Sequence, residues 1–255
     1  MRPARDFRPG RMYGVTQRGN RGQWVHADRD DFLEAIRLMR KYTVVYGVRI
    51  HAFTLMHNHS HWIFESSSEE SISNLMRDMQ GNYSRYLNRK YKFMPWLLLA
   101  PHLRSRGRRR GRGRRNYSPF LRAGPVNWSP RFHAVELDAA GYRTFMKYVE
   151  TNPVRAKLVK RAERWEWSSA AAHCGADRLP GGDFRGLLCL EAWQHVFGRP
   201  ATVATDWQAY LAGDADTDSE AVAVVPMPAG REGPYNRPVR WVAPTGGRVA
   251  GGESG

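Results

Sequence analysis

The chain has 255 residues and a formal net charge of +16, from 40 Lys and Arg against 24 Asp and Glu. This length suffices for one domain with a substantial core plus extensions. The excess of positive charge indicates a polyanionic partner, and nucleic acid is the first expectation. The sequence has neither a run of 18 apolar residues nor an apolar leader. It therefore disfavours a membrane-spanning or secreted protein and predicts a cytoplasmic one.

The first part of the chain reads as strand, helix, strand, strand and helix. Residues 11–17 contain β-formers before a Gly-Asn turn and predict a strand. Asp28 to Tyr42 carries an apolar stripe at helical spacing. Thr43 to Leu55 is rich in β-branched residues and predicts the second strand, which forms a hairpin with a third strand over His59 to Phe64. Ser71 to Asn88 repeats apolar residues at helical spacing and predicts the second helix.

The next segment has no hydrophobic period. Residues 97–127 read as an insertion, and within them 104–115 contains eight arginines and three glycines. Such a composition cannot bury a core. We therefore expect one domain over residues 1–195, which this insertion interrupts, and a C-terminal extension over 196–255. The extension is expected to be largely disordered from about residue 213, where Ala, Asp, Gly and Pro prevail.

Trp128 to Leu137 predicts a fourth strand, and Asp138 is a suitable N-cap for a helix over residues 139–151. Asn152-Pro153 is expected to interrupt this helix, because proline removes a helical hydrogen bond. A short helix over residues 154–160 is expected to follow. The order of elements predicts an α+β domain of the ferredoxin-like type, with an antiparallel sheet and helices on one face.

His59 and His61 are the most informative pair in the sequence. Side chains two apart on a strand point to the same face, roughly 7 Å from each other, so both imidazoles can bind one ion. Two histidine ligands leave coordination positions open, as a catalytic metal requires. An ordinary polar face of the sheet is the alternative. His57 has the same parity and extends the ligand set if its turn directs it there.

Tyr148 and Asn152 form the second candidate pair. Residues four apart share one helix face, about 6 Å from each other. A tyrosine oxygen can act as a nucleophile, and an amide oxygen suits a hard divalent ion. The alternatives are a tyrosine that only packs, and an asparagine that caps a new helix with Pro153 at its first position.

Five segments resemble the REP-associated tyrosine transposases, which belong to the single-tyrosine HUH transposases with an IS200-like domain. In chain order they are Tyr13–Arg21, His51–His61, Trp128–Phe132, Tyr148–Ala156 and Trp167–Ser169.

The resemblance implies the HUH endonuclease fold and a role for each candidate. His59 and His61 correspond to the two histidines that hold Mg²⁺ or Mn²⁺, Asn152 to the third ligand, and Tyr148 to the nucleophile. In the family, the tyrosine attacks single-stranded or hairpin DNA. It forms a 5′-phosphotyrosine bond and releases a 3′-hydroxyl that can later rejoin strands. Monomers and homodimers with the tyrosine supplied in trans both occur in such families, so a homodimer stays open.

The chain departs from the family pattern in three places. Ser60 stands where a bulky apolar residue is usual, and His57 stands where proline is common. Residues 97–127 are the third departure. None of these removes a catalytic group, so an active enzyme is still expected; whether Ser60 and the insertion reduce its efficiency stays open.

Arginines are the candidate DNA contacts. Those in the arginine-rich stretch suit binding to the phosphate backbone, although a charge run is often only a solvated face. The set comprises Arg18, Arg21, Arg104, Arg106, Arg108, Arg109, Arg110, Arg112, Arg114, Arg115 and Arg131.

The first hypothesis is a metal-dependent enzyme that nicks and rejoins hairpin-forming DNA, and that is associated with the nucleoid when bound to DNA. The second is a single-stranded DNA- or RNA-binding protein that keeps the fold without cleaving. A weaker third is a metal-binding regulator that uses all three neighbouring histidines.

Overall fold

The computed structural model describes residues 5, 7–20, 24–91, 128–129, 131–175, 187–189 and 204–212. The described residues up to Leu211 belong to one compact unit. Its centre is a four-stranded sheet with every neighbouring pair antiparallel. The strands are β1 (Met12–Arg18), β2 (Arg49–Leu55), β3 (His59–Glu65) and β4 (His133–Leu137), in the spatial order β2-β3-β1-β4.

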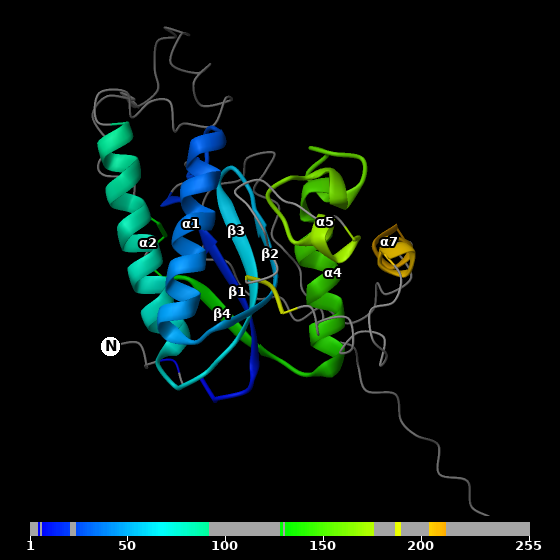
Figure 1. Ribbon diagram of the computed structural model, residues 1–255, viewed down its shortest axis with the longest axis horizontal. Helices are drawn as coiled ribbons and strands as arrows, with labels where there is room; N and C mark the ends of the chain where they lie inside the picture. The colour runs from blue at the N-terminus through cyan, green and yellow to red at the C-terminus, as the bar shows by residue number, and fades with distance from the viewer. Residues whose placement is uncertain are drawn as a thin grey trace, which may run out of the picture. The chain divides into compact units, whose positions relative to one another are not determined.

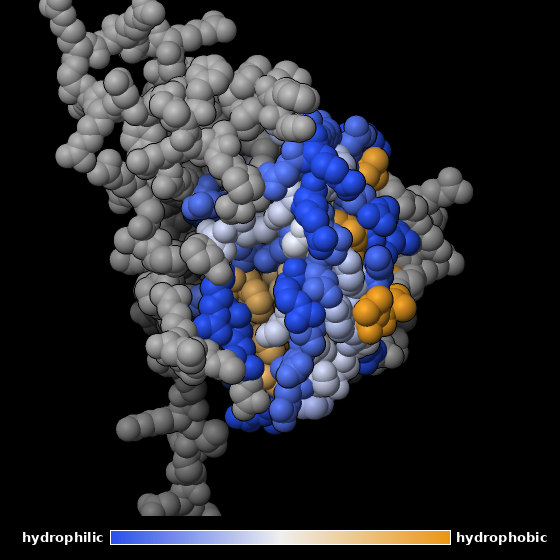
Figure 2. Space-filling view, turned by 90° about the vertical axis from the view of Figure 1, so that its left-hand side faces the viewer, coloured by the Kyte–Doolittle hydropathy of each residue, from blue (hydrophilic) through white to orange (hydrophobic). Residues whose placement is uncertain are grey.

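Two long helices cover one face of this sheet. They are α1 (Arg29–Tyr46), which follows β1, and α2 (Ser71–Lys90), which follows β3 (Figure 1). Alternate residues of the strands, such as Val15 and Trp62, pack beneath them in the main hydrophobic core. The outer surface on this side of the molecule is mostly hydrophilic (Figure 2). The order of strands and helices confirms the predicted ferredoxin-like α+β fold.

A further helix, α4 (Ala139–Arg155), lies on the opposite face of the sheet (Figure 1). The expectation that all helices share one face is therefore wrong. Gly14 of β1 allows a close approach, because a Cβ atom there would lie 2.8 Å from the Phe145 ring of α4. Three shorter helices follow α4 in the chain: η3 (Ala162–Arg164), α5 (Ala170–His173) and α7 (Ala204–Ala212).

Helix α1 runs through residues predicted to begin a strand. The β-branched run from Thr43 predicted β structure, but the helix continues to Tyr46 and ends where Gly47 adopts φ 61°. The Thr43 hydroxyl donates back to the Met39 carbonyl, 2.9 Å away, which suits it to a helical turn. Strand β2 therefore begins only at Arg49.

Helix α4 also continues where an interruption was predicted. Pro153 lies inside it, and no new helix begins at Asn152. Proline has no N–H, so it leaves the Val149 carbonyl, four residues earlier, without its helical donor. The Thr54 hydroxyl of β2 donates to that carbonyl at 2.7 Å. The sheet thus supplies the hydrogen bond that Pro153 removes, and the same bond fixes α4 on the sheet.

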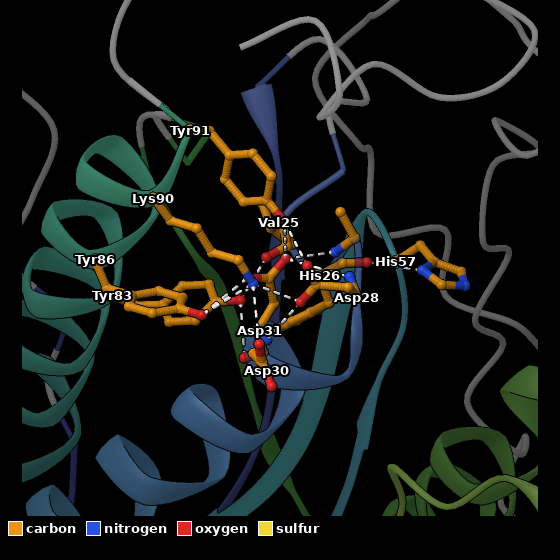
Figure 3. A network of polar contacts seen from close by, with 11 residues as sticks. Val25, His26, Asp28, Asp30, Asp31, His57, Tyr83, Tyr86, Lys90 and Tyr91 are labelled. Atoms are coloured by element: carbon orange, nitrogen blue, oxygen red, sulfur yellow. Dashed lines mark hydrogen bonds and ion pairs between the residues drawn. The ribbon is translucent and has the colours of Figure 1, made fainter. Parts of the chain in front are cut away.

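A buried polar network joins the start of α1 to the end of α2 (Figure 3). Asp31 is fully buried and accepts from Lys90 at 2.8 Å and from Tyr91 at 2.8 Å. The Tyr83 hydroxyl donates to the Val25 carbonyl. The network therefore fixes the segment that precedes α1, and this segment contacts the β2–β3 turn.

A second buried carboxylate, Glu150, lies on α4. It accepts from the Ser169 hydroxyl, from Trp207 Nε1 at 2.7 Å and from His173 Nδ1 at 2.6 Å. These bonds attach α5 and α7 to the helix that carries Tyr148.

None of the described helices is long and apolar enough to cross a membrane. The predicted domain boundary at residue 195, the whole insertion over 97–127 and the extension beyond residue 213 lie outside the described residues. These expectations stay predictions.

Candidate active site

The candidate site lies between β3 and α4, at the end of the sheet where β3 begins. Alternation along β3 directs His59 and His61 toward α4, and the two rings lie 4.9 Å apart between centroids. The register pairs them with Arg18 and Thr16 of β1. Tyr148 reaches the same place from α4, with its ring centroid 5.1 Å from that of His61. The fold thus brings together residues about 90 positions apart.

Both imidazoles are neutral, and each directs Nδ1 to an oxygen of the protein. His59 Nδ1 lies 2.6 Å from Asn58 Oδ1, and His61 Nδ1 lies 2.8 Å from Thr16 Oγ1. When Nδ1–H donates to these oxygens, Nε2 carries the lone pair that a metal ion needs. Burial lowers the pKa of both histidines. The nearby charge of Arg18 adds to this effect, and the pKa of His61 falls to about 3.

Tyr148 is buried, and its hydroxyl makes no hydrogen bond of normal geometry with the described residues. Burial raises its pKa to about 12, while the charges of Arg155 and Arg18 act in the opposite direction. An unpaired buried hydroxyl is unusual, because such groups are normally satisfied. Asn152 is close enough to lower the pKa of this phenol, and among the described residues the hydroxyl keeps the capacity for a further hydrogen-bond partner.

Asn152 lies beside the histidines, inside α4. Its Nδ2 is 3.3 Å from His61 Nε2. Since the helix continues past it, the interpretation as a helix cap is wrong. A half-turn of the amide exchanges Nδ2 and Oδ1 and presents an oxygen to the same space. Two neutral imidazoles and an amide oxygen fit a divalent ion.

His57 does not join this cluster. Its Nδ1 bonds to the His26 carbonyl at 2.7 Å, and its ring stacks on Trp24 with centroids 4.5 Å apart. Among the described residues, no group of three His, Cys, Asp or Glu can hold a metal ion. The hypothesis of a regulator that binds metal through His57, His59 and His61 is therefore wrong.

The predicted DNA contacts are described only in part. Arg18 is partly buried, and its neighbour in register is His59. Arg131 is exposed just before β4, whose first residue pairs with Thr16, so it lies at the same end of the sheet. Arg21 and every arginine in 104–115 lie outside the described residues, and their role stays a prediction.

The sequence interpretation missed Thr16 and Arg155. Thr16 was recognisable, because it precedes Arg18 by two positions on a predicted strand and so shares its face. The Arg155 guanidinium carbon lies 5.3 Å from the centroid of the Tyr148 ring. Its position was not predicted, because residue 155 was expected in a separate short helix after an interruption at Asn152-Pro153.

Beneath the histidines, Ser60 faces the α1–α2 side and is fully buried. It lines a cavity of about 20 Å³ together with Gln80 and Trp128. Ser60 Oγ, Gln80 Nε2 and Trp128 Nε1 are all buried without a hydrogen-bond partner among the described residues. A cavity of this size with three polar groups suits one water molecule.

Comparisons with known proteins complete this description. Residues 15–107 match the family model of IS200-like transposases. A REP-associated tyrosine transposase bound to a REP hairpin is similar in structure, with 16% sequence identity and a TM-score of 0.48 over 74% of this chain and 98% of the other. A candidate transposase from Deinococcus radiodurans R1 shows 13% identity and a TM-score of 0.34, over 62% of this chain and 92% of the other. No curated protein matches. The similarity to the IS200-like transposase family thus extends over residues 15–107, less than half of the chain.

Proposed function

We propose that this protein is a metal-dependent single-stranded DNA endonuclease and strand transferase of the REP-associated tyrosine transposase type. The observation that carries the proposal is the meeting of three kinds of group at one point. A buried tyrosine with an unpaired hydroxyl lies beside two neutral histidines and an amide. A helix that only packed on the sheet would not need this combination.

Each group has a role in this proposal. The Tyr148 oxygen attacks a phosphodiester and forms a bond to phosphorus as the bond to the 3′ oxygen breaks. The phenol loses its proton, and the departing 3′ oxygen gains one, so the products are a 5′-phosphotyrosine and a 3′-hydroxyl. His59, His61 and Asn152 would hold Mg²⁺ or Mn²⁺. A bound ion would neutralise charge on the phosphate oxygens and favour the phenolate.

The chain's own cations suit a DNA substrate. Burial raises the pKa of Tyr148 to about 12, so little phenolate exists at neutral pH without positive charge nearby. Arg18 and Arg155 both lower that pKa. The net charge of +16 favours a polyanion at long range. We propose single-stranded or hairpin DNA as the partner; the similar REP-associated transposase is described with a REP hairpin.

The test is a covalent adduct on a denaturing gel. Hairpin oligonucleotides are incubated with the full chain and Mn²⁺. We expect an adduct with the natural sequence and none with Tyr148→Phe, which keeps DNA binding. Tyr142→Phe is the matched control, because it also removes a buried hydroxyl from α4 but one that bonds to His51; its adduct should persist. If both variants form adduct equally, Tyr148 is not the nucleophile. If DNA binds but is never cleaved with any ion, the non-cleaving DNA- or RNA-binding protein becomes the better account.

A further inference from the structure

The continuation of α4 past Pro153 places a third side chain on the face that carries Tyr148 and Asn152. Residues at positions i, i+4 and i+7 of a helix lie along one face. Arg155 is the seventh residue after Tyr148 and the last of the helix. Had the helix ended at Asn152, the direction of this arginine would be undefined.

Arg155 lies against Tyr148 but stays open to solvent. Its guanidinium carbon is 5.3 Å from the centroid of the tyrosine ring, and the residue is exposed while Tyr148 is buried. An exposed arginine over an aromatic ring is often no more than a cation–π contact. Two further observations separate this arginine from that case.

The first is the lack of an acidic partner. Within the described part of the chain, Arg155 forms no ion pair. The exposed Arg37 and Arg77 do form such pairs, with Glu34 and Asp78, whereas Arg143 of α4, like Arg155, does not. Among the described residues, the Arg155 guanidinium therefore keeps its donors for a ligand.

The second is the surrounding charge. Arg18 lies on the sheet side of the same tyrosine and histidine cluster, so a group that reaches the Tyr148 hydroxyl meets cationic residues from β1 and from α4. Arginine presents a planar fork of donors that matches a phosphate.

We propose that Arg155 binds the phosphate group that Tyr148 attacks, and holds it at the tyrosine oxygen. This inference rests on the proposed function for the identity of the substrate. It adds a specific residue from α4 that the sequence pattern did not assign.

The test compares Arg155→Gln with Arg143→Gln. Arg143 is also exposed on α4 but lies five positions before Tyr148, on another face, so both variants lose one positive charge from one helix. In the first arm, inorganic phosphate is titrated into the full chain, and the ¹⁵N signals of the His61 imidazole are followed by NMR. We expect the response of the natural sequence to persist in Arg143→Gln and to need roughly 10-fold more phosphate in Arg155→Gln.

The second arm measures cleavage of a hairpin oligonucleotide. Arg155→Gln should lower kcat by roughly 100-fold with little change in DNA affinity. Arg155→Lys should restore part of the rate, because it keeps the charge without the fork.

The outcomes separate the two proposals. Loss of the phosphate response in Arg155→Gln, in a protein that never cleaves DNA, supports the phosphate site and sinks the proposed function. Equal behaviour of Arg155→Gln and Arg143→Gln in both arms overturns the role of Arg155. The absence of any phosphate response at His61 in the natural sequence, together with unaltered cleavage by Arg155→Gln, overturns it as well.

Discussion

Thr54→Val tests the bond that allows α4 to pass through Pro153. The two side chains have the same shape, so the change removes one hydroxyl from a fully buried position. The Val149 carbonyl then loses its 2.7 Å donor. Its regular helical donor is absent because residue 153 is proline. A buried carbonyl without a donor costs about 1–3 kcal/mol, and we expect a loss of this size in the free energy of unfolding.

Thr43→Val is the matched control. Thr43 is also buried, and its hydroxyl also donates to a helix carbonyl, that of Met39 at 2.9 Å. The Met39 carbonyl lies within α1 four residues before Thr43, where the Thr43 amide is the regular helical donor. Removing this hydroxyl therefore leaves no carbonyl unpaired, and we expect a cost below about 1 kcal/mol.

Urea unfolding of the full chain measures both variants. The midpoints give the change in free energy if the slopes agree. Pro153→Ala provides a second check, because it restores an amide donor for Val149. Thr54→Val should cost less when made together with Pro153→Ala than when made alone. If Thr54→Val costs no more than Thr43→Val, or if Pro153→Ala has no effect on its cost, the Thr54 hydroxyl does not replace the missing helical bond.

Further predictions concern the site and its supports. Gly14→Ala places a methyl group 2.8 Å from the Phe145 ring, so urea unfolding should show a loss of about 1–3 kcal/mol in the free energy of unfolding. An unchanged midpoint would mean that α4 moves away from the sheet without a cost in stability. Asn152→Ala should shrink the rise in Tm that Mn²⁺ gives the natural sequence and leave the metal-free Tm nearly unchanged; an equal rise would exclude it as a ligand. Burial lowers the pKa of His26 to about 4, below its unfolded value near 6.5. Between these values the unfolded chain thus binds more protons at this residue, and His26 should contribute about 3 kcal/mol to the loss of stability as pH drops from 6.5 to 4, beside the losses from His59 and His61, whose pKa values are lowered too. His26→Gln should make that part of the profile less steep, and an unaltered profile would contradict the shift. Ser60→Ala should cost about 1 kcal/mol, because it removes one partner of a buried water, whereas a stabilised variant would indicate a dry cavity.

Local patterns predicted most of the fold. The β2–β3 hairpin and the alternation that directs His59 and His61 to one face both depend on residues close together in the sequence. Both predictions agree with the structure. The end of α1 was misplaced because the β-branched run before Gly47 satisfies a strand pattern equally well. The helix ends only at Gly47, which adopts φ 61°. The propensities of the residues before it do not predict that this glycine takes the left-handed conformation that ends the helix.

The candidate site was less predictable, because its geometry depends on a contact between distant elements. Pro153 is a sound reason to end a helix when the chain is taken alone. Thr54, almost 100 residues earlier, supplies the bond that overrules it. The same contact holds α4 on the face of the sheet opposite α1 and α2, and it lets the helix continue to Arg155. The sequence therefore predicted neither the position of α4 nor that of Arg155. The nature of the residues near Tyr148 was therefore predictable, whereas the face on which they meet was not.

The most direct test identifies the residue that becomes linked to DNA. A hairpin oligonucleotide is incubated with the full chain and Mn²⁺, the product is digested with protease and nuclease, and the modified peptide is sequenced by mass spectrometry. We predict one nucleotide attached through its 5′-phosphate to Tyr148. A nucleotide attached to another residue would contradict the site described above. DNA that is cleaved without any attached peptide would contradict the covalent mechanism itself.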